Sequence, residues 1–220
     1  MNSDKNQNTQ REHPHTYLDK ERLSSYIYQV EYASVCKPKN ILYIGKGTGI
    51  APYLLSRGPG APEVITLDND QELKPDILGS VLDIPLENKA VDLTMCCQVL
   101  EHLPFDEFLA ALQEMCRVTR RRLILSLPDK RLYFSMRIKV PLIRLSLQLS
   151  LPRPDTMFRS CPKWKFKKSG HCWEIGYKGT SLGAVKKKIR QSGWIINEIK
   201  RVPDFSWHTF FDLYPLDTME

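Results

Sequence analysis

The stretch ILYIGKGTGI at residues 41–50 decides the fold, because an apolar run of strand length ends there in three closely spaced glycines. Residues 40–44 are typical of a buried strand, and residues 50–57 then show the apolar spacing of a helix with Pro52 in its first turn. Gly45, Gly47 and Gly49 form the turn between them. Glycine leaves the backbone bare and a helix N-terminus points its amides outward, so this turn predicts a site of nucleotide type.

The spacing of the glycines distinguishes three kinds of nucleotide-binding turn. The phosphate-binding loop needs G-x-x-x-x-G-K-S/T, which this sequence lacks, and the dinucleotide fingerprint G-x-G-x-x-G would need glycine where Ile50 stands. The turn reads G-x-G-x-G instead, and Asp68 follows 19 residues later at the end of a second apolar run. A carboxylate there can accept hydrogen bonds from two ribose hydroxyls, which favours a nucleoside ligand.

Outward from this unit, apolar runs of strand length alternate with helical patterns. Leu23, Tyr26, Ile27 and Val30 predict the apolar side of a helix that begins near Tyr17 and ends before Pro38. Further helices are predicted over 104–118 and 180–193, and further strands over 64–67, 77–82, 91–96, 123–127, 194–202 and 206–214. The fold class is therefore α/β: a three-layer, Rossmann-like fold with a seven-stranded, mostly parallel sheet and a C-terminal antiparallel hairpin.

Length and composition fit one folded domain. The 220 residues lie in the usual range for a single domain, and 42% hydrophobic with 26% charged residues argue against disorder and against a coiled coil. Residues 1–15 are polar and predict a disordered tail, which leaves 16–220 as one domain. No run of about 18 apolar residues occurs, and the six cysteines lack metal-binding spacing, so we expect a cytoplasmic protein with reduced thiols and no metal.

The charge of the chain is concentrated in one segment. Residues 117–168 hold 15 lysines and arginines against only Asp129 and Asp155, a net charge of +13 within a total of +7. Much of this segment belongs to an insertion at about 129–176, which interrupts the alternation of strands and helices. Such a separation of charge indicates a negatively charged partner.

Several pieces of the sequence, in order, resemble the class I S-adenosylmethionine-dependent methyltransferases. They are ILYIGKGTG at 41–49, VITLDND at 64–70, DIP at 83–85, KAVDLTMCCQVLEHLP at 89–104 and LILSLP at 123–128, and together they span about residues 40–128. Within that class, the VLEH segment after the fourth strand resembles one broad group. The resemblance implies a Rossmann-like methyltransferase fold, S-adenosylmethionine as cofactor and transfer of its methyl group to an acceptor.

The resemblance also implies where the cofactor binds. The three glycines would pass close to its methionine part, Asp68 would bind the ribose, and Asn69 would flank the adenine. Gln98 would lie near the sulfonium, and Ser80 to Asp83 on the other side of the adenine. The implied cofactor residues are Tyr43, Gly45, Gly47, Gly49, Asp68, Asn69, Val81, Leu82, Asp83 and Gln98.

Tyr43 departs from the family pattern. The family usually has Asp or Glu two residues before the first glycine, where the acid helps to hold the ammonium group of the cofactor. A tyrosine hydroxyl offers no full charge, and charge-assisted hydrogen bonds are roughly twice as strong as neutral ones. This departure leaves open a non-catalytic module that binds S-adenosylmethionine, while a nucleotide-dependent oxidoreductase is opposed by Ile50 and the VLEH segment.

Two histidines are candidates for a catalytic base. His102 follows Glu101 at the start of a helical segment, and His171 lies in GHCWEIGY, where the insertion returns to the fold. A histidine near its reference pKa of about 6.5 can take a proton at neutral pH, although local packing explains either residue and many methyl transfers need no base. Trp173, Glu174 and Tyr177 are candidates for binding the acceptor, or else for a buried anchoring turn.

The basic insertion has three candidate partners. We favour a substrate lid that closes over an anionic small molecule, because variable segments beside the site commonly shape the acceptor pocket in this family. Nucleic acid would suit CPKWKFKK at 161–168, where lysines surround Trp164 and Phe166. An anionic membrane surface would suit residues 131–150, where basic and apolar residues alternate, although Pro141 interrupts a helix there. The sequence names neither the acceptor atom nor the oligomeric state.

Overall fold

The computed structural model describes residues 19–140, 143–162, 169–203 and 205–219. The predicted disordered tail at 1–15 lies outside the described residues, as do 163–168 with Trp164 and Phe166.

A seven-stranded sheet forms the centre of the molecule, as predicted. Its strands lie in the order β3-β2-β1-β4-β5-β9-β8. The bounds are β1 Asn40–Ile44, β2 Glu63–Asp68, β3 Ile77–Leu78, β4 Val91–Cys97, β5 Thr119–Pro128, β8 Trp194–Val202 and β9 Phe205–Pro215. The first five pair in parallel, and β9 pairs antiparallel with both β5 and β8. The predicted α/β class and the C-terminal antiparallel hairpin are therefore confirmed.

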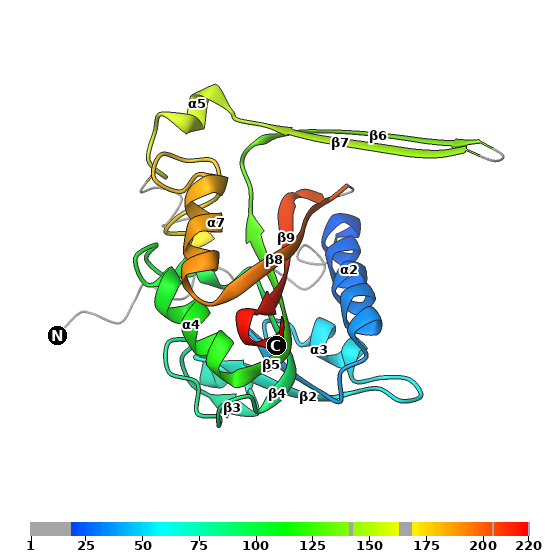
Figure 1. Ribbon diagram of the computed structural model, residues 1–220, viewed down its shortest axis with the longest axis vertical. Helices are drawn as coiled ribbons and strands as arrows, with labels where there is room; N and C mark the ends of the chain where they lie inside the picture. Colours follow the sequence, from blue (N-terminus) through cyan, green and yellow to red (C-terminus); the bar gives the residue numbers. More distant parts are fainter. Residues whose placement is uncertain (1–18, 141–142, 163–168, 204, 220) are drawn as a thin grey trace.

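Helices cover both faces of this sheet and give the three predicted layers (Figure 1). On one face lie α2 Lys20–Cys36 and α3 Ile50–Leu55, whose buried residues share a cluster with those of β1. On the other face lie α4 Phe108–Val118 and α7 Leu182–Gln191. Short helices η1 Gln71–Leu73, η2 Leu100–His102, α5 Pro154–Met157 and η3 Leu216–Met219 complete the described elements. No helix in this described part of the chain is both long and apolar enough to cross a membrane.

Two predicted elements differ in detail from the structure. The strand predicted over 77–82 is only Ile77–Leu78, because the chain turns at Ser80, where the Asp83 amide donates to the Ser80 carbonyl. Helix α2 turns only part of its predicted side inward, where Tyr26 and Val30 pack against the core. Leu23 and Ile27 are exposed, whereas Ser25 and Gln29 are buried. A buried polar helix face indicates polar neighbours rather than a plain apolar core.

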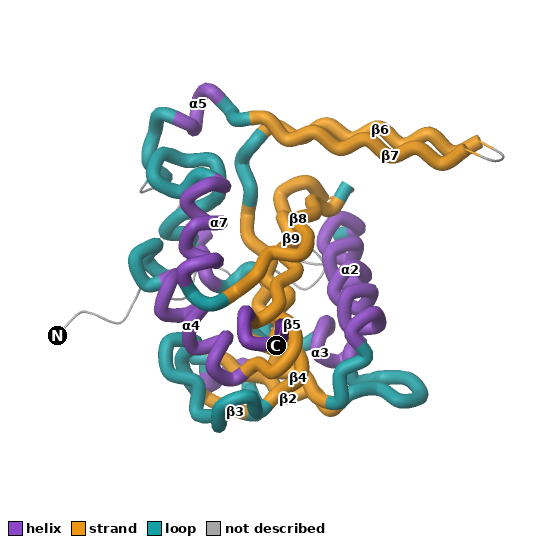
Figure 2. The backbone as a smooth tube through the Cα atoms, in the orientation of Figure 1, coloured by secondary structure: helices purple, strands orange, loops and turns teal. Residues whose placement is uncertain are grey.

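Residues 132–151 differ from the expected lid. Strands β6 Leu132–Val140 and β7 Ile143–Leu151 pair antiparallel and form a ribbon that extends away from the body of the molecule (Figures 1 and 2). The physical reason is the alternation of apolar and polar residues with a period of two, which suits a strand with two unlike faces. The ribbon begins four residues after the carboxyl end of β5.

Candidate functional site

A cavity of about 320 Å³ opens at the carboxyl ends of β1, β2 and β4. The chain proceeds from β1 to β2 and β3 on one side and then continues with β4 on the other, so strand order reverses between β1 and β4. Ligands of open α/β sheets bind at such a switch point. The wall opposite the strand ends comes from α2, through Arg22, Ser25, Tyr26 and Gln29.

The glycine turn closes the cavity at the end of β1. Gly45 and Gly47 line it, with φ of 82° and 52°, values that favour glycine. A Cβ atom at Gly45 would stand 2.3 Å from Val99 Cγ2, so this position has no room for a side chain. Gly49 does not line the cavity but caps α3 with a φ of 76°. The predicted turn therefore has the backbone conformation that a close ligand approach requires.

Asp68 lies at the end of β2 and lines the same cavity. Its Oδ2 accepts a hydrogen bond from the Lys46 amide at 2.7 Å, and its Oδ1 accepts one from the Asp70 amide at 3.0 Å. A carboxylate has about four acceptor positions, so two remain for hydroxyl groups of a ligand. The two amides fix the carboxylate beside the glycine turn, where a ribose acceptor is expected.

The other predicted cofactor residues divide into two groups. Tyr43, Asn69, Val81 and Gln98 line the cavity, whereas Leu82 and Asp83 do not and lie beyond the turn that begins at Ser80. Ser80, at the start of the predicted segment 80–83, lines the cavity as well. Residues that the prediction left out complete the lining, among them Lys46, Thr48, Ala51, Gly79, Cys97 and Val99.

Tyr43 is buried, and its hydroxyl donates to Gln29 Oε1 of α2 at 2.8 Å. The position where the family has an acid is therefore occupied by a neutral pair that joins β1 to the helix wall. The Tyr43 oxygen retains acceptor capacity toward a ligand cation.

Gln98 follows β4 with a φ of 59°, a left-handed conformation that is uncommon for residues other than glycine and recurs at functional sites. One orientation of the Gln98 side-chain amide pairs its nitrogen with acceptors and its oxygen with donors. The nitrogen then donates to Glu101 Oε1 at 3.2 Å and to His208 Nε2 at 3.3 Å, while the oxygen accepts from Ser126 Oγ and the Leu127 amide. Gln98 thus connects the cavity wall to two buried titratable groups.

His208 from β9 is a cavity residue that the sequence reasoning missed. Its Nδ1 lies 2.9 Å from Ser25 Oγ of α2, 183 positions away in the sequence. Burial, together with the nearby Arg22 and His171, lowers the pKa of His208 to about 3. The ring is therefore neutral, and with Nε2 accepting from Gln98 the proton resides on Nδ1 and points to Ser25.

Glu101, in η2, has no exposed surface, and burial raises the pKa of its carboxyl to about 8, with the charge of Glu174 adding to the effect. Its Oε2 has no hydrogen-bond partner among the described residues. Glu101 Oε1 lies 4.0 Å from His171 Nε2. At neutral pH most of this carboxyl is protonated, because its pKa lies above 7.

The two candidate histidines lie together. The rings of His102 and His171 meet edge to face at 5.1 Å between centroids. His171 Nδ1 lies 2.9 Å from Glu174 Oε1, and His102 Nδ1 lies 3.2 Å from the Gly170 carbonyl. Both partners are acceptors, so each neutral ring carries its proton on Nδ1 and leaves the lone pair on Nε2. Burial and the neighbouring His171 lower the pKa of His102, which favours its neutral form.

His102 lines the cavity, whereas His171 stands one layer behind it. Trp173, Glu174 and Tyr177, the predicted acceptor residues, do not line the cavity and are buried. Trp173 packs edge to face on Phe105 and Phe108 and donates from Nε1 to the Leu103 carbonyl at 3.1 Å. The structure thus places Trp173 in the core, bonded to the cavity residue Leu103, and places Glu174 on His171, behind His102.

The same cluster has the groups that a metal ion would need. Glu101, His102 and His171 each offer a ligand atom, and these atoms lie within 4.8 Å of one another. The expectation of a protein without metal stays a prediction.

The fold and the cavity define a class: α/β proteins that bind a nucleoside-containing ligand between a glycine turn and an acid at the end of the second strand. Residues 42–126 match the family described as methyltransferase domain. No curated protein matches the chain significantly in sequence. The matched residues include the glycine turn, Asp68 and Gln98, so this part of the chain is similar to methyltransferase domains.

Solved structures share this fold at low sequence identity. A 1,6-didemethyltoxoflavin-N1-methyltransferase from Burkholderia thailandensis, with bound S-adenosylhomocysteine, is 14% identical with a TM-score of 0.55 over 89% of this chain and 79% of its own. An S-adenosylmethionine-dependent methyltransferase from Mesorhizobium loti is 11% identical with a TM-score of 0.53, over 80% of this chain and 90% of its own. The small RNA methyltransferase HEN1 is 12% identical with a TM-score of 0.59, over 90% of this chain and 26% of its own.

Proposed function

We propose that the protein transfers a methyl group from S-adenosylmethionine to a small anionic acceptor bound beside His102. The observation that carries the proposal is the position of the paired imidazoles. His102 lines the cofactor cavity, and its ring meets that of His171 edge to face in a cluster that also contains Glu101. The acceptors of the structural neighbours include a small molecule and RNA, so the choice of a small molecule rests on this cavity.

The residues of the cavity fit the cofactor. Bare backbone at Gly45 and Gly47 leaves room for its methionine part, and Asp68 offers acceptor positions for ribose hydroxyls. When bound, S-adenosylmethionine supplies a methyl group on a positively charged sulfur, which is a strong electrophile. The protein then has two tasks: to hold the acceptor in line with the methyl group and to remove a proton where the acceptor has one.

The histidine pair suits the second task. The Glu174 carboxylate orients the His171 ring through Nδ1, as a carboxylate does for a histidine in an acid–base pair. His102 is neutral and faces the cavity, so its Nε2 is the group placed to accept a proton from the acceptor. S-adenosylmethionine, held by the glycine turn and Asp68, would supply the methyl group, whose bond to sulfur would break toward sulfur as the electron pair of the acceptor atom formed the new bond.

One basic residue of the described chain supports an anionic acceptor, since Arg22 of α2 lines the cavity. Lys130, at the start of the basic insertion, contacts Glu174 and Trp207 and does not line the cavity. No described residue of 129–176 lines the cavity, so the substrate lid stays a prediction. The cytoplasmic location stays a prediction.

Calorimetry separates this proposal from its rivals. S-adenosylmethionine and S-adenosylhomocysteine are expected to bind, and nicotinamide dinucleotides are not. Release of S-adenosylhomocysteine is then measured with small carboxylates, small phenols and short RNA as acceptors. His102→Gln should lower turnover about a hundredfold with cofactor affinity unchanged, the loss typical of a missing general base. Cofactor binding without turnover of any acceptor would favour the non-catalytic module suggested by Tyr43, and turnover of RNA alone would replace the small-molecule acceptor.

A further inference from the structure

The ribbon of β6 and β7 carries an unbroken apolar row. The register places four apolar pairs directly across it: Leu132 with Leu151, Phe134 with Leu149, Met136 with Leu147 and Ile138 with Leu145. Alternate residues of a strand point to the same side, so the eight side chains share one face. Each is 40 to 56% exposed. Exposed apolar residues of a monomer are normally scattered, and a row of this size indicates an interaction surface.

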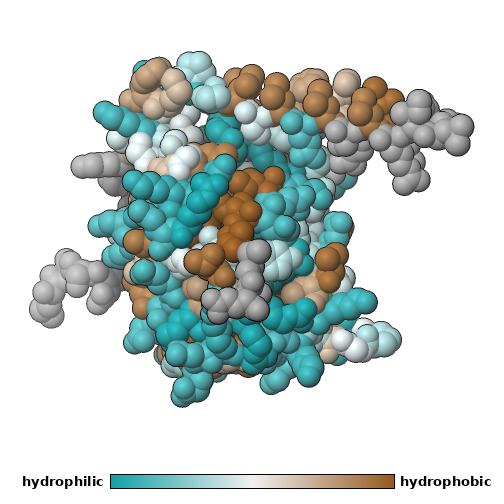
Figure 3. Space-filling view, viewed as in Figure 1, coloured by the Kyte–Doolittle hydropathy of each residue, from teal (hydrophilic) through white to brown (hydrophobic). Residues whose placement is uncertain are grey.

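Contacts at the base of the ribbon turn this row away from the body. Arg201 of β8 lies over the Tyr133 ring, 4.8 Å from its centroid, and its Nη1 donates to Ser150 Oγ at 3.4 Å. Tyr133 and Ser150 pair across the ribbon at alternate positions to the apolar row, so they belong to its other face. Because this other face contacts the body, the apolar row faces outward, as Figure 3 shows along the upper side of the ribbon.

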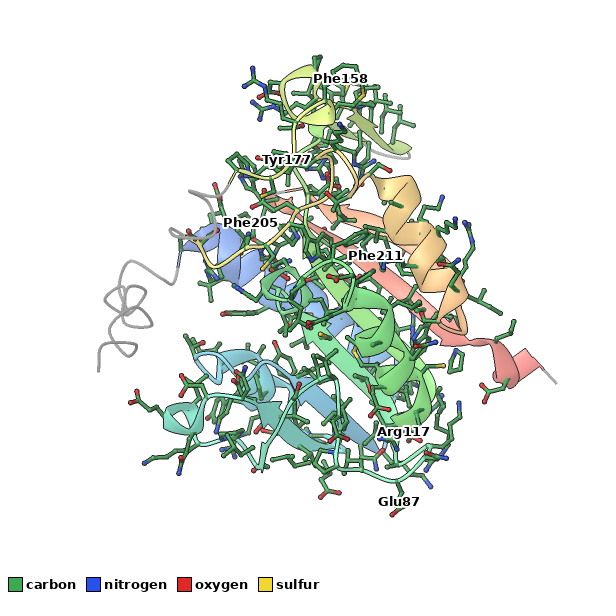
Figure 4. The ribbon with its side chains drawn as sticks, turned by 90° about the vertical axis from the view of Figure 1, so that its left-hand side faces the viewer. Glu87, Arg117, Phe158, Tyr177, Phe205 and Phe211 are labelled. Carbon is green, nitrogen blue, oxygen red and sulfur yellow. The ribbon has the colours of Figure 1, made fainter. Side chains whose placement is uncertain are left out.

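The chemistry around the row is basic. Residues 130–154 contain six lysines and arginines and no acidic residue. Three of the six, Arg137, Lys139 and Arg144, occupy alternate positions to the apolar row. At the same end of the molecule Phe158 is 73% exposed (Figure 4). It precedes Arg159, whose carbonyl accepts from the Lys178 amide.

We infer that the ribbon binds flat to the surface of an anionic phospholipid bilayer. Its apolar row enters the boundary between headgroups and acyl chains, and its basic residues stay at the level of the phosphates. Segments with one apolar face and one basic polar face bind membranes in this way, through apolar burial and attraction to anionic lipids. Each strand has only one partner, so its outer backbone groups would lose their hydrogen bonds in hydrocarbon, which restricts the ribbon to the interface.

Two other occupants fit the row less well. Single-stranded nucleic acid binds through aromatic rings that stack on bases, and Phe134 is the one aromatic residue of the row, so the aliphatic side chains would gain little. A second copy of the chain would pack its own row against this one and bring together two segments, residues 130–154 of each copy, that each hold six basic and no acidic residues. An anionic bilayer satisfies the apolar row and the positive charge together.

The first test uses the unmodified full chain with vesicles of two compositions. Vesicles with about one third phosphatidylserine should bind the protein at least about tenfold more tightly than vesicles of phosphatidylcholine alone, and added salt should weaken this binding. Sedimentation of the vesicles measures both. Equal binding to the two compositions, or no binding to either, would overturn the inference.

The second test assigns the binding to the apolar row. The double variant Phe134→Thr, Leu149→Thr removes one central pair while threonine keeps the strand propensity. Its matched control is Ser135→Thr, Gln148→Thr, a cross-strand pair on the other face of the same ribbon. The first should lose at least about tenfold in binding to anionic vesicles and the control should lose none, with thermal unfolding of the body unchanged in both.

Light scattering in solution tests whether two copies of the chain associate through their ribbons. A monomer whose vesicle binding depends on Phe134 and Leu149 supports the inference. A dimer that these substitutions dissociate, or short RNA that binds the row in place of vesicles, would sink it. Since vesicle binding needs neither cofactor nor acceptor, its failure would leave the proposed methyl transfer untouched.

Discussion

Asp68 is oriented before any ligand arrives, because the amides of Lys46 and Asp70 already bind its carboxylate. Asp68→Ala should therefore weaken S-adenosylmethionine binding by about 2 kcal/mol, roughly thirtyfold, since ribose hydroxyls lose a charged acceptor. Calorimetry measures the change. Asp70→Ala is the matched control, because the Asp70 side chain accepts from the Glu72 amide and does not line the cavity. Equal affinity of the Asp68 variant and the unmodified protein would remove Asp68 from the site.

Glu101 gives the protein a pH dependence with a definite sign. Its pKa is about 8 in the folded protein against an ordinary 4.5, so between these values the folded state holds a proton that the unfolded chain releases. Stability therefore falls as pH rises through this range. Glu101→Gln cannot titrate, and urea unfolding should show its stability relative to the unmodified protein increasing from about pH 5 to about pH 8. A constant difference across that range would place the Glu101 pKa near its ordinary value.

At the scale of the element, the glycine turn has little tolerance for substitution. Gly45 has a φ of 82°, and an added Cβ would meet Val99 Cγ2 at 2.3 Å, so Gly45→Ala should destabilise the fold by at least about 2 kcal/mol and weaken cofactor binding. Gly183→Ala in α7 is the control, because its new Cβ would meet only Ser181 Oγ at 3.6 Å and alanine favours a helix by about 1 kcal/mol. Thermal unfolding of both variants checks the contrast. A Gly45 variant as stable as the Gly183 variant would show that the turn relaxes.

The elements of the sheet could be predicted from the sequence because each buried strand is a short run of consecutive apolar residues bounded by turn residues. NILYI at 40–44 and VDLTMCC at 91–97 are two such runs. Helix α2 shows where this logic ends. Its Leu23 and Ile27 have the spacing of a buried stripe, yet Ser25 and Gln29 face inward because the helix forms the wall of a polar cavity. The spacing of apolar residues predicts which face of a helix is apolar. It does not show that polar residues of another face are buried against polar partners.

Site residues could be predicted from the sequence where they lie at or just after the end of a parallel strand, as Gly45, Gly47, Asp68 and Gln98 do. The carboxyl ends of these strands lie at one edge of the sheet, so residues there come close together. His208 comes from the antiparallel strand β9, and its contact with Ser25 depends on how the hairpin lies beside α2. The ribbon was missed for a different reason. Its apolar and polar residues alternate in the sequence as they do in a strand. A prediction from such a pattern assumes that the apolar face is buried against a core, and this apolar row is exposed.

At the scale of the whole molecule, a buried ion pair joins the parallel part of the sheet to the hairpin. Arg122 of β5 donates from Nε and Nη2 to the Asp212 carboxylate of β9 at 2.5 and 2.6 Å, and Asn197 of β8 donates to the same carboxylate at 2.7 Å. Arg122→Met would leave Asp212 buried with one partner and should cost about 3 to 5 kcal/mol. Urea unfolding measures this loss.

Two comparisons make the ion-pair prediction specific. Arg153 and Asp155 form a pair in which both side chains are exposed, so Arg153→Met should cost far less stability than Arg122→Met. The double variant Arg122→Met, Asp212→Leu removes both buried charges and should recover much of the loss. A double variant no more stable than Arg122→Met alone would mean that shape, rather than unpaired charge, dominates the cost.

The ribbon and the body of the molecule should differ in how easily their backbone hydrogen bonds open. Its strands bond only to each other, whereas β1 and β4 are central strands with neighbours on both sides and no exposed apolar side chain. A two-stranded hairpin is marginal on its own, so it can open without disturbing the body. Backbone amides of β6 and β7 should exchange with deuterium long before those of β1 and β4, which wait for global unfolding. A protease should accordingly cut this protein first within the ribbon and leave a folded body that still binds its cofactor.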